Sequence, residues 1–409
     1  MKVFFINNVY RIGSTGNIVY NIQRYLECKG IETFVAFGNF NAPPAVNVYK
    51  FGTCIETKLH SILAKFGNLQ YRGSSIATAR LIRAIKREKP DIVHIHCLNG
   101  YCVNLYALLE FLAKNKYKTM VTHHAEFYYT GSCSHAKECM KFTRPQGCSR
   151  CEDFTGATHS LIWDNTNLHW RAMHNAFSMF DKEDLLFTAV SPWVKNRAML
   201  SPIVNDFPCI VVKNGIDTNV FHRNENWEYI KSKMPNLGRN FIVHVTATFE
   251  PDRKDSIKGS LYVVEIARKF PQYDIIVVAS TMSEQIPNLP ANIHMWGRAL
   301  SQNELSILYS TARMTLLTSQ RETFSMVCAE SLSCGTPVVG FYSGGPESIA
   351  LPDYTFFSPF GDIAKICEEI NKCLSISWDR NKICKDSSLE YANEIMSSTY
   401  LDAYYKLLK

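Results

Sequence analysis

The chain has 409 residues, of which 46% are hydrophobic and 20% are charged. This is ordinary globular composition, which excludes fibrous and disordered architectures, and the length suffices for about two or three domains. The net charge of +7 favours anionic partners in general. The sequence has no apolar run near the roughly 18 residues of a membrane span, and the run after Lys2 is too short for a signal peptide. We therefore expect a soluble, cytoplasmic protein.

The first half of the chain alternates strand and helix patterns. A buried strand over Lys2 to Asn8 is expected to lead through a polar turn, residues 13–17, into an amphipathic helix ending at Lys29-Gly30. The later elements are predicted at 32–38 (strand), 76–88 (helix), 91–96 (strand), 105–114 (helix) and 118–123 (strand). Strands that alternate with helices predict a parallel sheet covered on both faces.

The same alternation restarts after Asn214-Gly215. Strands are predicted at 241–248, 274–279, 292–296, 314–318 and 336–341, and helices at 259–270, 303–309 and 324–333. Two such runs predict two doubly wound domains, residues 1–207 and 208–386. Because ligands bind beyond the carboxyl ends of parallel strands, two such domains facing each other form a cleft lined by strand-to-helix loops.

Two glutamates with seven residues between them carry the strongest chemical signal. Glu322 is expected in a loop, and Glu330 inside the helix that follows it. The free N–H groups around Phe324 and Ser325 can bind an anion or a sugar hydroxyl. A carboxylate can accept hydrogen bonds from two adjacent hydroxyls, so Glu330 suits a ribose and Glu322 a hexose. A pair of solvated surface charges is the commoner case for arbitrary glutamates, but the residues around this pair favour function.

The segment Glu322 to Val339 resembles the hallmark of the retaining family 4 glycosyltransferases of the GT-B fold, which is Glu-x7-Glu followed by a Gly-x-Pro-Val-Val run. The resemblance covers nearly the whole chain, through Asn214-Gly215-Ile216-Asp217, Lys258-Gly259 and Gly344-Gly345-Pro346-Glu347. It implies an α/β, GT-B architecture of two Rossmann-like doubly wound domains facing across a cleft. It also implies that a final helix, 387–409, packs back on the first domain.

Within this family the chain looks most like bacterial exopolysaccharide and O-antigen enzymes of the colanic-acid type. The residues that carry this likeness are His94-Ile-His96, Thr122-His-His124 and Thr130-Gly131-Ser-Cys133. It implies transfer of a hexose, with retention, from a nucleotide diphosphate sugar to a glycan or a polyprenyl-diphosphate-linked oligosaccharide. UDP-sugar is the expected donor and GDP-sugar the alternative. Nucleic acid is not an expected partner.

The resemblance assigns roles to individual residues. It implies that the donor phosphates are bound by Gly16, Arg253 and Lys258, and the donor sugar by Glu322, Thr323, Phe324 and Ser325. It implies that the ribose and base are bound by Glu330, Gly297 and Arg298, and that the acceptor side is formed by Gly13, Asn99 and His124. His124 and Glu322 are the expected catalytic residues. For Arg253 a solvated loop cation is about as good an interpretation, and for Gly13-x-x-Gly16 a plain tight turn is the alternative.

His124 matches a position where related enzymes have His-Asp, but here Ala125 follows and Glu126 lies beyond it. Our hypothesis is that His124 contacts the transferred sugar or the acceptor, with Glu126 as its substitute partner. The alternative is a structural histidine. His94 and His96 alternate onto one strand face, and we expect His94 to serve packing.

Four cysteines, Cys133, Cys139, Cys148 and Cys151, fall in one predicted loop. The Cys-x2-Cys half fits a tetrahedral zinc site, but the other half has non-standard spacing. Three states of these cysteines are possible: a structural zinc site, one or two disulfides, or reduced thiols packed in the loop. The reduced state is favoured, because we expect the chain not to be exported.

The chain contains no Asp-x-Asp sequence, so we expect cationic side chains rather than a catalytic metal to hold the diphosphate.

A basic stretch over 58–89 is interleaved with Leu59, Ile62, Leu63 and Phe66. It fits an amphipathic segment on anionic lipid, at the inner face of the cell membrane, and also a core helix with a solvated face, which is commoner.

Two other functions stay open. A nucleotide-sugar epimerase or a phosphorylase shares the fold and would turn over without a glycan acceptor. A zinc-containing nucleic-acid-binding protein could use the cysteine loop and its basic neighbours, but the glutamate pair and the repeated strand-helix alternation have no purpose in it.

Overall fold

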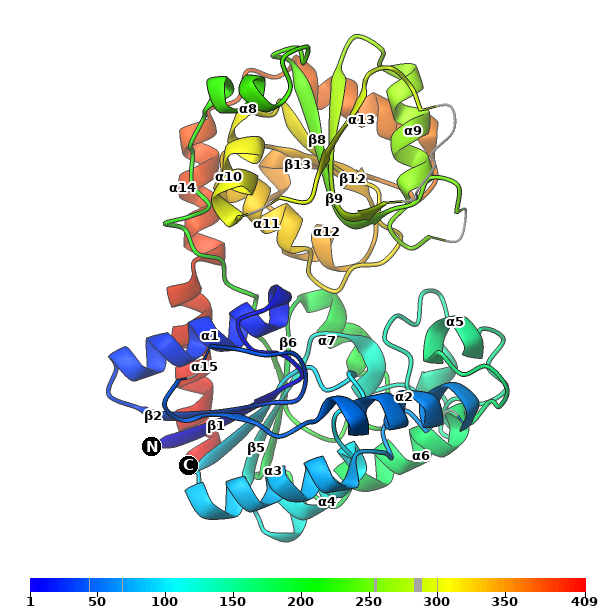
Figure 1. Ribbon diagram of the computed structural model, residues 1–409, viewed down its shortest axis with the longest axis vertical. Coiled ribbons are helices and arrows are strands. Elements are labelled where there is room, and N and C mark those ends of the chain that lie inside the picture. Colours follow the sequence, from blue (N-terminus) through cyan, green and yellow to red (C-terminus); the bar gives the residue numbers. More distant parts are fainter. Residues whose placement is uncertain (44, 68, 254–255, 283–288, 300) are drawn as a thin grey trace. The chain divides into compact units, whose positions relative to one another are not determined.

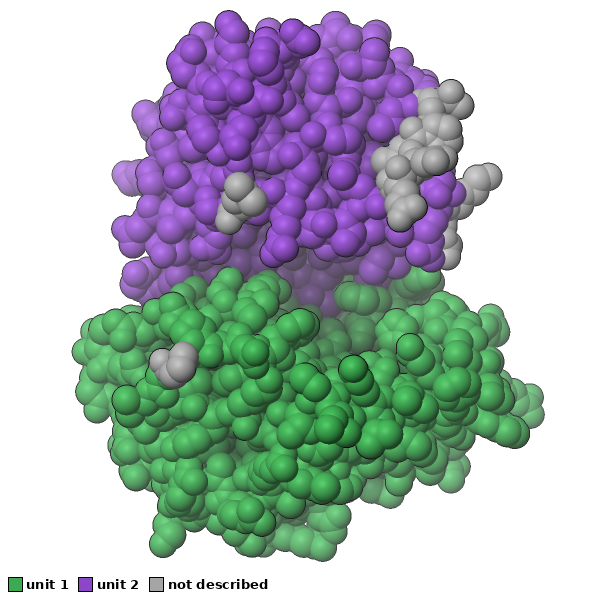
Figure 2. Space-filling model, in the orientation of Figure 1, with its two compact units in different colours: residues 1–213, 396–409 green, residues 214–395 purple. Residues whose placement is uncertain are grey.

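The computed structural model describes residues 1–409 apart from 44, 68, 254–255, 283–288 and 300. The chain forms two compact units (Figure 2), a first unit of residues 1–213 with 396–409 and a second unit of residues 214–395. Each unit is built on a parallel sheet with helices packed on it. The predicted pair of doubly wound, Rossmann-like domains is therefore confirmed.

The sheet of the first unit is parallel throughout the described residues. Its order is β3 (Val48–Lys50), β2 (Glu32–Phe37), β1 (Lys2–Asn7), β4 (Ile92–Ile95), β5 (Lys118–His123), β6 (Leu185–Ala189), β7 (Cys209–Val211). Val3 lies opposite Thr33 on one side and Ile92 on the other. Chain order reverses between β1 and β4, so the carboxyl ends of these strands form the switch point at which open α/β sheets bind ligands.

The first helix of the first unit begins earlier than the sequence predicts. The helices of this unit are α1 (Gly13–Cys28), α2 (Cys54–Gly67), α3 (Ser75–Glu88), α4 (Leu105–Lys114), α5 (Phe154–Thr158), α6 (Thr166–Phe177) and α7 (Pro192–Ala198), with short 3₁₀ turns η1 (Glu126–Tyr128) and η2 (Lys141–Thr143). Residues 13–17, predicted as a turn, are thus the first turn of α1. Gly13 takes a left-handed φ of 64° at this start, which glycine adopts without strain.

The second unit repeats the architecture (Figure 1). Its parallel sheet has the order β10 (Ile293–Gly297), β9 (Asp274–Met282), β8 (Phe241–Phe249), β11 (Met314–Leu317), β12 (Val338–Phe341), β13 (Thr355–Ser358). The helices are α8 (Trp227–Lys233), α9 (Ser260–Lys269), α10 (Gln302–Thr311), α11 (Met326–Ser333), α12 (Gly345–Ile349), α13 (Ile363–Ser375) and α14 (Arg380–Tyr391), with the turn η3 (Pro352–Tyr354). Here the order reverses between β8 and β11.

The unit boundary lies a few residues beyond the predicted one at 207. Residues Cys209–Val211 form β7, which pairs with β6 at the edge of the first sheet. The first unit therefore continues to Lys213.

Within the described residues no helix is both long and apolar enough to cross a bilayer.

The predicted single helix over 387–409 is two helices. α14 ends at Tyr391, and α15 (Asn393–Leu408) begins after an extended residue, Ala392. The break accommodates the chain at Ile216, whose N–H donates to the Tyr391 carbonyl at 2.7 Å and whose carbonyl accepts from the Asn393 N–H at 3.0 Å. Further along, α15 buries Met396, Tyr400, Ala403, Tyr404 and Leu407 in the core of the first unit.

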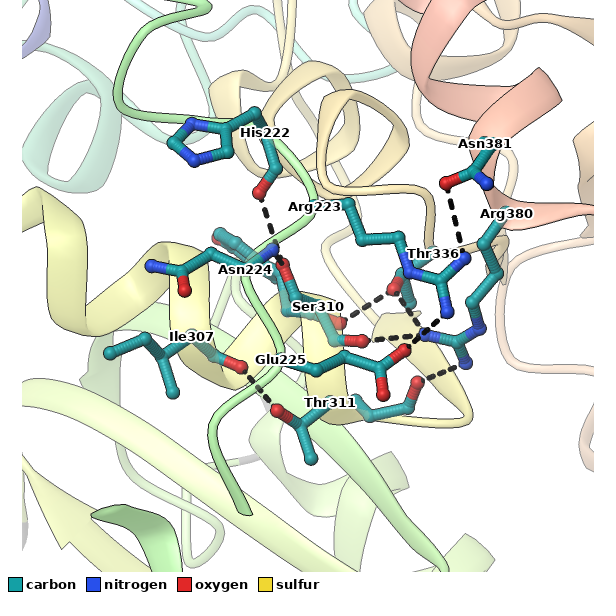
Figure 3. A network of polar contacts seen from close by, with 12 residues as sticks. His222, Arg223, Asn224, Glu225, Ile307, Ser310, Thr311, Thr336, Arg380 and Asn381 are labelled. Carbon is teal, nitrogen blue, oxygen red and sulfur yellow. Dashed lines mark hydrogen bonds and ion pairs between the residues drawn. The ribbon is translucent and has the colours of Figure 1, made fainter. Parts of the chain in front are cut away.

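A half-buried arginine closes the carboxyl end of α10 (Figure 3). Arg380 of α14 donates to the carbonyls of Ser310 at 2.7 Å and Ala312 at 2.5 Å, and to Thr336 Oγ1 at 3.2 Å. These carbonyls lack partners within the helix, and the cation also complements the negative end of the helix dipole. Arg380 therefore ties the end of α10 to α14 and to the loop after α11.

Candidate active site

A cation and a carboxylate meet at the switch point of the second unit. Lys258 follows β8 and Glu322 follows β11, the two strands between which chain order reverses. Lys258 Nζ lies 2.7 Å from Glu322 Oε1, and the side chains are 28% and 25% exposed. A ligand can therefore reach both groups, in the position at which doubly wound sheets bind nucleotides.

The turn that carries Lys258 is held by the loop after β11. The Ile257 carbonyl accepts from the Gln320 N–H at 2.8 Å, and the Lys258 carbonyl accepts from Thr318 Oγ1 at 3.0 Å. Gly259 has a φ of 64°, and a Cβ there would lie 2.0 Å from the Thr318 carbonyl oxygen. Only glycine permits this close approach. Thr318 and Gln320 therefore position Lys258, although the sequence analysis did not identify them.

The Glu322 loop is held in turn by the loop after β12. The Glu322 N–H donates to the Ser343 carbonyl at 3.0 Å, and the Glu322 carbonyl accepts from the Gly345 N–H at 2.8 Å. A Cβ on Gly345 would lie 2.4 Å from the carbonyl carbon of Thr323. The carboxylate of Glu347 accepts from the backbone N–H groups of Ser343 at 3.1 Å and Gly344 at 2.6 Å. Gly345 and Glu347 thus have positioning roles at this edge.

Helix α11 begins two residues later than predicted. Ser325 is its N-cap, with a φ of 75°, and its Oγ accepts from the Cys328 N–H at 3.3 Å. Phe324 is buried and packs edge-on against Tyr391, with ring centroids 6.4 Å apart. Thr323 to Ser325 therefore form a fixed loop ahead of a helix N-terminus, where backbone N–H groups and the helix dipole favour an anionic or hydroxyl oxygen.

Glu330 lies inside α11, as the sequence predicts, and is partly exposed. The hydroxyl of Tyr309, a buried residue of α10, donates to Glu330 Oε2 at 3.2 Å. Burial raises the pKa of the Glu330 carboxyl from its ordinary value of 4.5 to about 7. The carboxyl thus exchanges its proton near neutral pH, and such displaced pKa values are typical of functional sites.

Three other predicted donor residues come from the loop after β8 and from the end of β10. The Arg253 guanidinium is 56% exposed and lies 3.5 Å from Glu250 Oε2 in the same loop. Gly297 ends β10 with a φ of 83°, and Arg298 follows it, exposed. Because β10 is an edge strand, separated from β11 by β9 and β8, Gly297 and Arg298 lie further along the same sheet edge.

Three asparagines lie together at the switch point of the first unit. The Asn8 N–H donates to the Cys97 carbonyl at 2.9 Å, and Asn8 Oδ1 accepts from Asn39 Nδ2 at 2.7 Å. A Cβ on Gly100 would lie 2.1 Å from Asn8 Oδ1. Asn99 lies beside this group and donates to Ser134 Oγ at 3.4 Å. Asn99 was predicted from the sequence, but Asn8 and Asn39 were not, because they stand in no motif of their own.

His124 ends a row of buried histidines. Its Nε2 lies 3.0 Å from His96 Nδ1, and the His96 ring lies against the His94 ring, tilted by 36° with centroids 3.9 Å apart. His94 lies between Tyr404 Oη at 2.6 Å and Thr122 Oγ1 at 2.7 Å, so it serves packing as expected. Burial lowers the pKa of His124 to about 3, which keeps this imidazole neutral at physiological pH.

The predicted pairing of Glu126 with His124 is replaced by another contact. Glu126 is fully buried, and its carboxylate accepts from Arg197 Nε at 2.7 Å, from the Tyr129 hydroxyl at 3.1 Å and from the Ala136 N–H at 2.6 Å. A buried carboxylate needs such partners to offset desolvation. Glu126 therefore binds α7 to the cysteine loop.

The four cysteines line a cavity of about 630 Å³ in the first unit. All four are free thiols, and burial raises the pKa of Cys148 to about 12. Among the described residues, no group of three or more His, Cys, Asp or Glu side chains is arranged to hold a metal ion. As placed, the four thiols therefore do not converge on one metal position, and structural zinc stays a prediction.

Known proteins resemble both units. A family model described as Glycosyltransferase Family 4 matches residues 15–220, and one described as Glycosyl transferases group 1 matches residues 278–388. N-acetyl-alpha-D-glucosaminyl L-malate synthase of Bacillus anthracis is 20% identical over 356 residues, which cover 84% of this chain and 82% of that protein.

Solved structures share the fold over almost the whole chain. Anabaena HepE in complex with UDP and glucose aligns with a TM-score of 0.67 at 16% identity, covering 99% of both chains. Sucrose-phosphate synthase of Thermosynechococcus elongatus aligns with a TM-score of 0.67 at 14% identity, covering 99% of this chain and 98% of that one. The two doubly wound units thus have the GT-B fold, and with the family model over residues 15–220 they show that this chain belongs to Glycosyltransferase Family 4.

Proposed function

We propose that this glycosyltransferase moves a hexose from a nucleoside diphosphate sugar to a hydroxyl of a glycan or of a polyprenyl-diphosphate-linked oligosaccharide, with retention of configuration. UDP-sugar is the favoured donor and GDP-sugar the alternative. The observation that carries the proposal is the Lys258–Glu322 pair at the second switch point, beside the N-terminus of α11. The UDP complexes of Anabaena HepE, which shares the fold, support UDP as the first nucleotide to test.

In this proposal, Lys258 leaves Glu322 and binds the donor diphosphate, where its charge stabilises the leaving group. Arg253 is the second candidate cation on the exposed loop after β8. Glu322 and the backbone of Thr323 to Ser325 then bind hydroxyls of the transferred sugar. Glu330, in its ionised form, accepts hydrogen bonds from the two ribose hydroxyls, and Gly297 and Arg298 border the base.

The reaction needs no nucleophile from the protein. The bond between the sugar C1 and the diphosphate oxygen breaks, and the acceptor oxygen bonds to C1 on the same face. The acceptor proton passes to an oxygen of the departing diphosphate. Gly13, Asn99 and His124 are the candidate residues on the acceptor side, and Gly16 is a further candidate for the donor phosphates. The neutral imidazole of His124 is the candidate group that contacts the acceptor or the transferred sugar.

The test is a binding and turnover panel. Thermal stability is measured with UDP, GDP, ADP, CMP and their common sugar conjugates, because a ligand that binds only the folded state raises stability by mass action. We expect a shift with UDP and UDP-hexoses that disappears in Glu330→Ala, and turnover that requires a glycan acceptor and survives chelation. Turnover without an acceptor would point instead to an epimerase, and no shift with any nucleotide would overturn the donor assignment.

A further inference from the structure

Helix α2 packs on the first unit with its polar side inward. Among its described side chains, only His60 and Ala64 are buried. One outward stripe carries five large apolar side chains at helical spacing: Ile55, Leu59, Ile62, Leu63 and Phe66, which are 74%, 57%, 52%, 49% and 52% exposed. A surface helix normally turns such a stripe toward the core, so this orientation calls for a partner outside the unit.

Polar contacts fix this orientation. His60 Nδ1 lies 3.0 Å from Ser74 Oγ, and His60 Nε2 accepts from the Gly73 N–H at 3.1 Å. A Cβ on Gly73 would lie 2.4 Å from the His60 ring, so the chain passes close over it. At the other end of the helix, the Glu56 carboxylate accepts from the Ala77 N–H at 2.9 Å. The polar side chains His60 and Glu56 on the inner face of α2 thus have hydrogen-bond partners. Rotation of the helix would bury the apolar stripe but would break these hydrogen bonds.

A second exposed apolar segment adjoins the helix. Leu161, Ile162 and Trp163 are 58%, 54% and 62% exposed. The Leu161 N–H donates to the Lys65 carbonyl at 2.6 Å, which joins this segment to the end of α2. Figure 1 shows α2 on the same side of the first unit as α5 and α6, between which the segment runs. We call the five residues of α2 together with Leu161, Ile162 and Trp163 the apolar patch.

Cations surround the apolar patch. Lys58 and Lys65 are exposed within the helix stripe, and Arg72 is exposed shortly after it. Of the acidic groups nearby, Glu56 pairs with Arg80, and Asp164 accepts from the Cys151 N–H. An outward apolar face, flanking cations and an exposed tryptophan are the features of a segment that lies in a membrane interface. A symmetric contact through this patch would bring the lysines of both copies into one interface, and crowding of like charges there is unfavourable.

We propose that the apolar patch is a membrane-docking surface that inserts into the headgroup region of a bilayer containing anionic phospholipid. The apolar side chains enter the boundary between headgroups and acyl chains, and the cations contact lipid phosphates. This assignment goes beyond the proposed transfer reaction, because the apolar patch lies in the first unit and the donor residues lie in the second.

The test is co-sedimentation of the full chain with vesicles of phosphatidylcholine alone or mixed with phosphatidylglycerol. We expect binding to the mixed vesicles that weakens with salt, since exposed charges are screened. Leu59→Ser should weaken partitioning by about tenfold or less, and Ile62→Ser/Phe66→Ser by more than tenfold, because each removes apolar area from the interface. Lys58→Glu/Lys65→Glu should abolish the preference for phosphatidylglycerol.

The matched control is Leu389→Ser, which changes a leucine of α14 that is 66% exposed, outside the apolar patch. It should bind vesicles as the unchanged protein does. Tryptophan emission should shift to shorter wavelength on vesicle addition and lose this shift in Trp163→Phe. All variants should keep the melting temperature and the affinity for UDP, which separates failure of docking from failure of the donor site.

Equal sedimentation of the patch variants and the unchanged protein would overturn the proposal. So would a dimer in light scattering that the patch variants convert to a monomer while vesicle binding is absent, since a second copy would then cover the apolar patch.

Discussion

Lys258 Nζ lies 2.7 Å from Glu322 Oε1, so in the absence of donor each group neutralises the other. A diphosphate that takes over Lys258 would free Glu322 to accept a sugar hydroxyl. Substitution of Lys258 should therefore affect UDP binding, whereas substitution of Glu322 should affect turnover. We expect Lys258→Ala to weaken UDP binding by about 1.5–3 kcal/mol, the range for hydrogen bonds to charged groups, and Glu322→Gln to leave UDP binding nearly intact but lower turnover at least tenfold.

Isothermal titration with UDP and turnover with UDP-hexose measure the two effects. Lys269→Ala, an exposed lysine in the last turn of α9, is the control that loses the same charge elsewhere in the unit. Equal UDP affinity of Lys258→Ala and Lys269→Ala would contradict the phosphate role.

The raised pKa of Glu330 predicts two opposite pH trends. Because the folded state holds this proton more tightly than the unfolded state, its contribution to stability is full below pH 4.5 and is lost as pH rises through about 7. Ribose binding requires the ionised carboxylate, so UDP affinity should rise over the same range. Glu330→Gln should flatten both trends, as melting temperatures and titrations at pH 5.5 and 8, roughly either side of that pKa, would reveal. A UDP affinity in the unchanged protein that is the same at both pH values would exclude the ribose role.

Gly345→Ala tests the close approach of two loops. An added Cβ would lie 2.4 Å from the Thr323 carbonyl carbon, and backbone must move to relieve such a clash. We expect a loss of about 1–3 kcal/mol in unfolding free energy, as for overpacked sites, and a loss of UDP-hexose affinity larger than that of UDP. Gly67→Ala is the control, since its Cβ would meet only the Leu69 side chain, at 3.4 Å. If the Gly345 variant matches this control in denaturant melts and in titration, the loops are not coupled as described.

His124→Ala tests the acceptor side. We expect turnover to fall about 100-fold or more, the range for a lost acid-base or positioning group, while UDP affinity stays unchanged. Because the pKa of His124 is about 3, this imidazole should contribute no titration to the rate between pH 5 and 8. His159→Ala, a surface histidine, is the control. Near-normal turnover of a correctly folded His124 variant would leave the residue with a structural role.

Arg380→Ala should destabilise the second unit by about 2–4 kcal/mol, because two partly buried carbonyls and a hydroxyl lose a charged donor. Arg380→Lys should fall in between, since an ammonium cannot span the same acceptors as a planar guanidinium. Urea unfolding measures both. Because α10 also carries Tyr309, we expect a weaker contact with Glu330 and a moderate loss of UDP affinity. Identical stability of Arg380→Ala and the unchanged protein would rule out the capping role.

The alternation of strands and helices predicted the two sheets, because strands covered on both faces are long apolar runs that single-sequence patterns reveal. Element ends were less predictable. The break at Ala392 depends on Ile216, which lies far away in sequence and pairs with Tyr391 and Asn393. Likewise β7 is a short edge strand whose three residues carry no periodicity.

At the candidate site, the motif identified the residues with chemistry but not those that position them. Lys258 and Glu322 were found because their types and spacing resemble a known family. Thr318 and Gln320 act through hydrogen bonds to the turn that carries Lys258, and such bonds leave no spacing rule in the sequence. Glu347 stands in a segment that carries the family resemblance, but its hydrogen bonds to the N–H groups of Ser343 and Gly344 were not predicted. Glu126 was misjudged because proximity along the chain suggested His124, whereas Arg197 supplies the compensating charge.

The division of α15 between the two units means that they differ in how they can be isolated. Residues 214–395 are contiguous, so the second unit can be expressed from one uninterrupted stretch of coding sequence. Residues 1–213 alone would lack Tyr400, Tyr404 and Leu407 and would leave a hydrophobic groove open where α15 packs. The first unit can be obtained by itself only if the final helix is supplied, either as a separate peptide or by circular permutation that joins it ahead of β1.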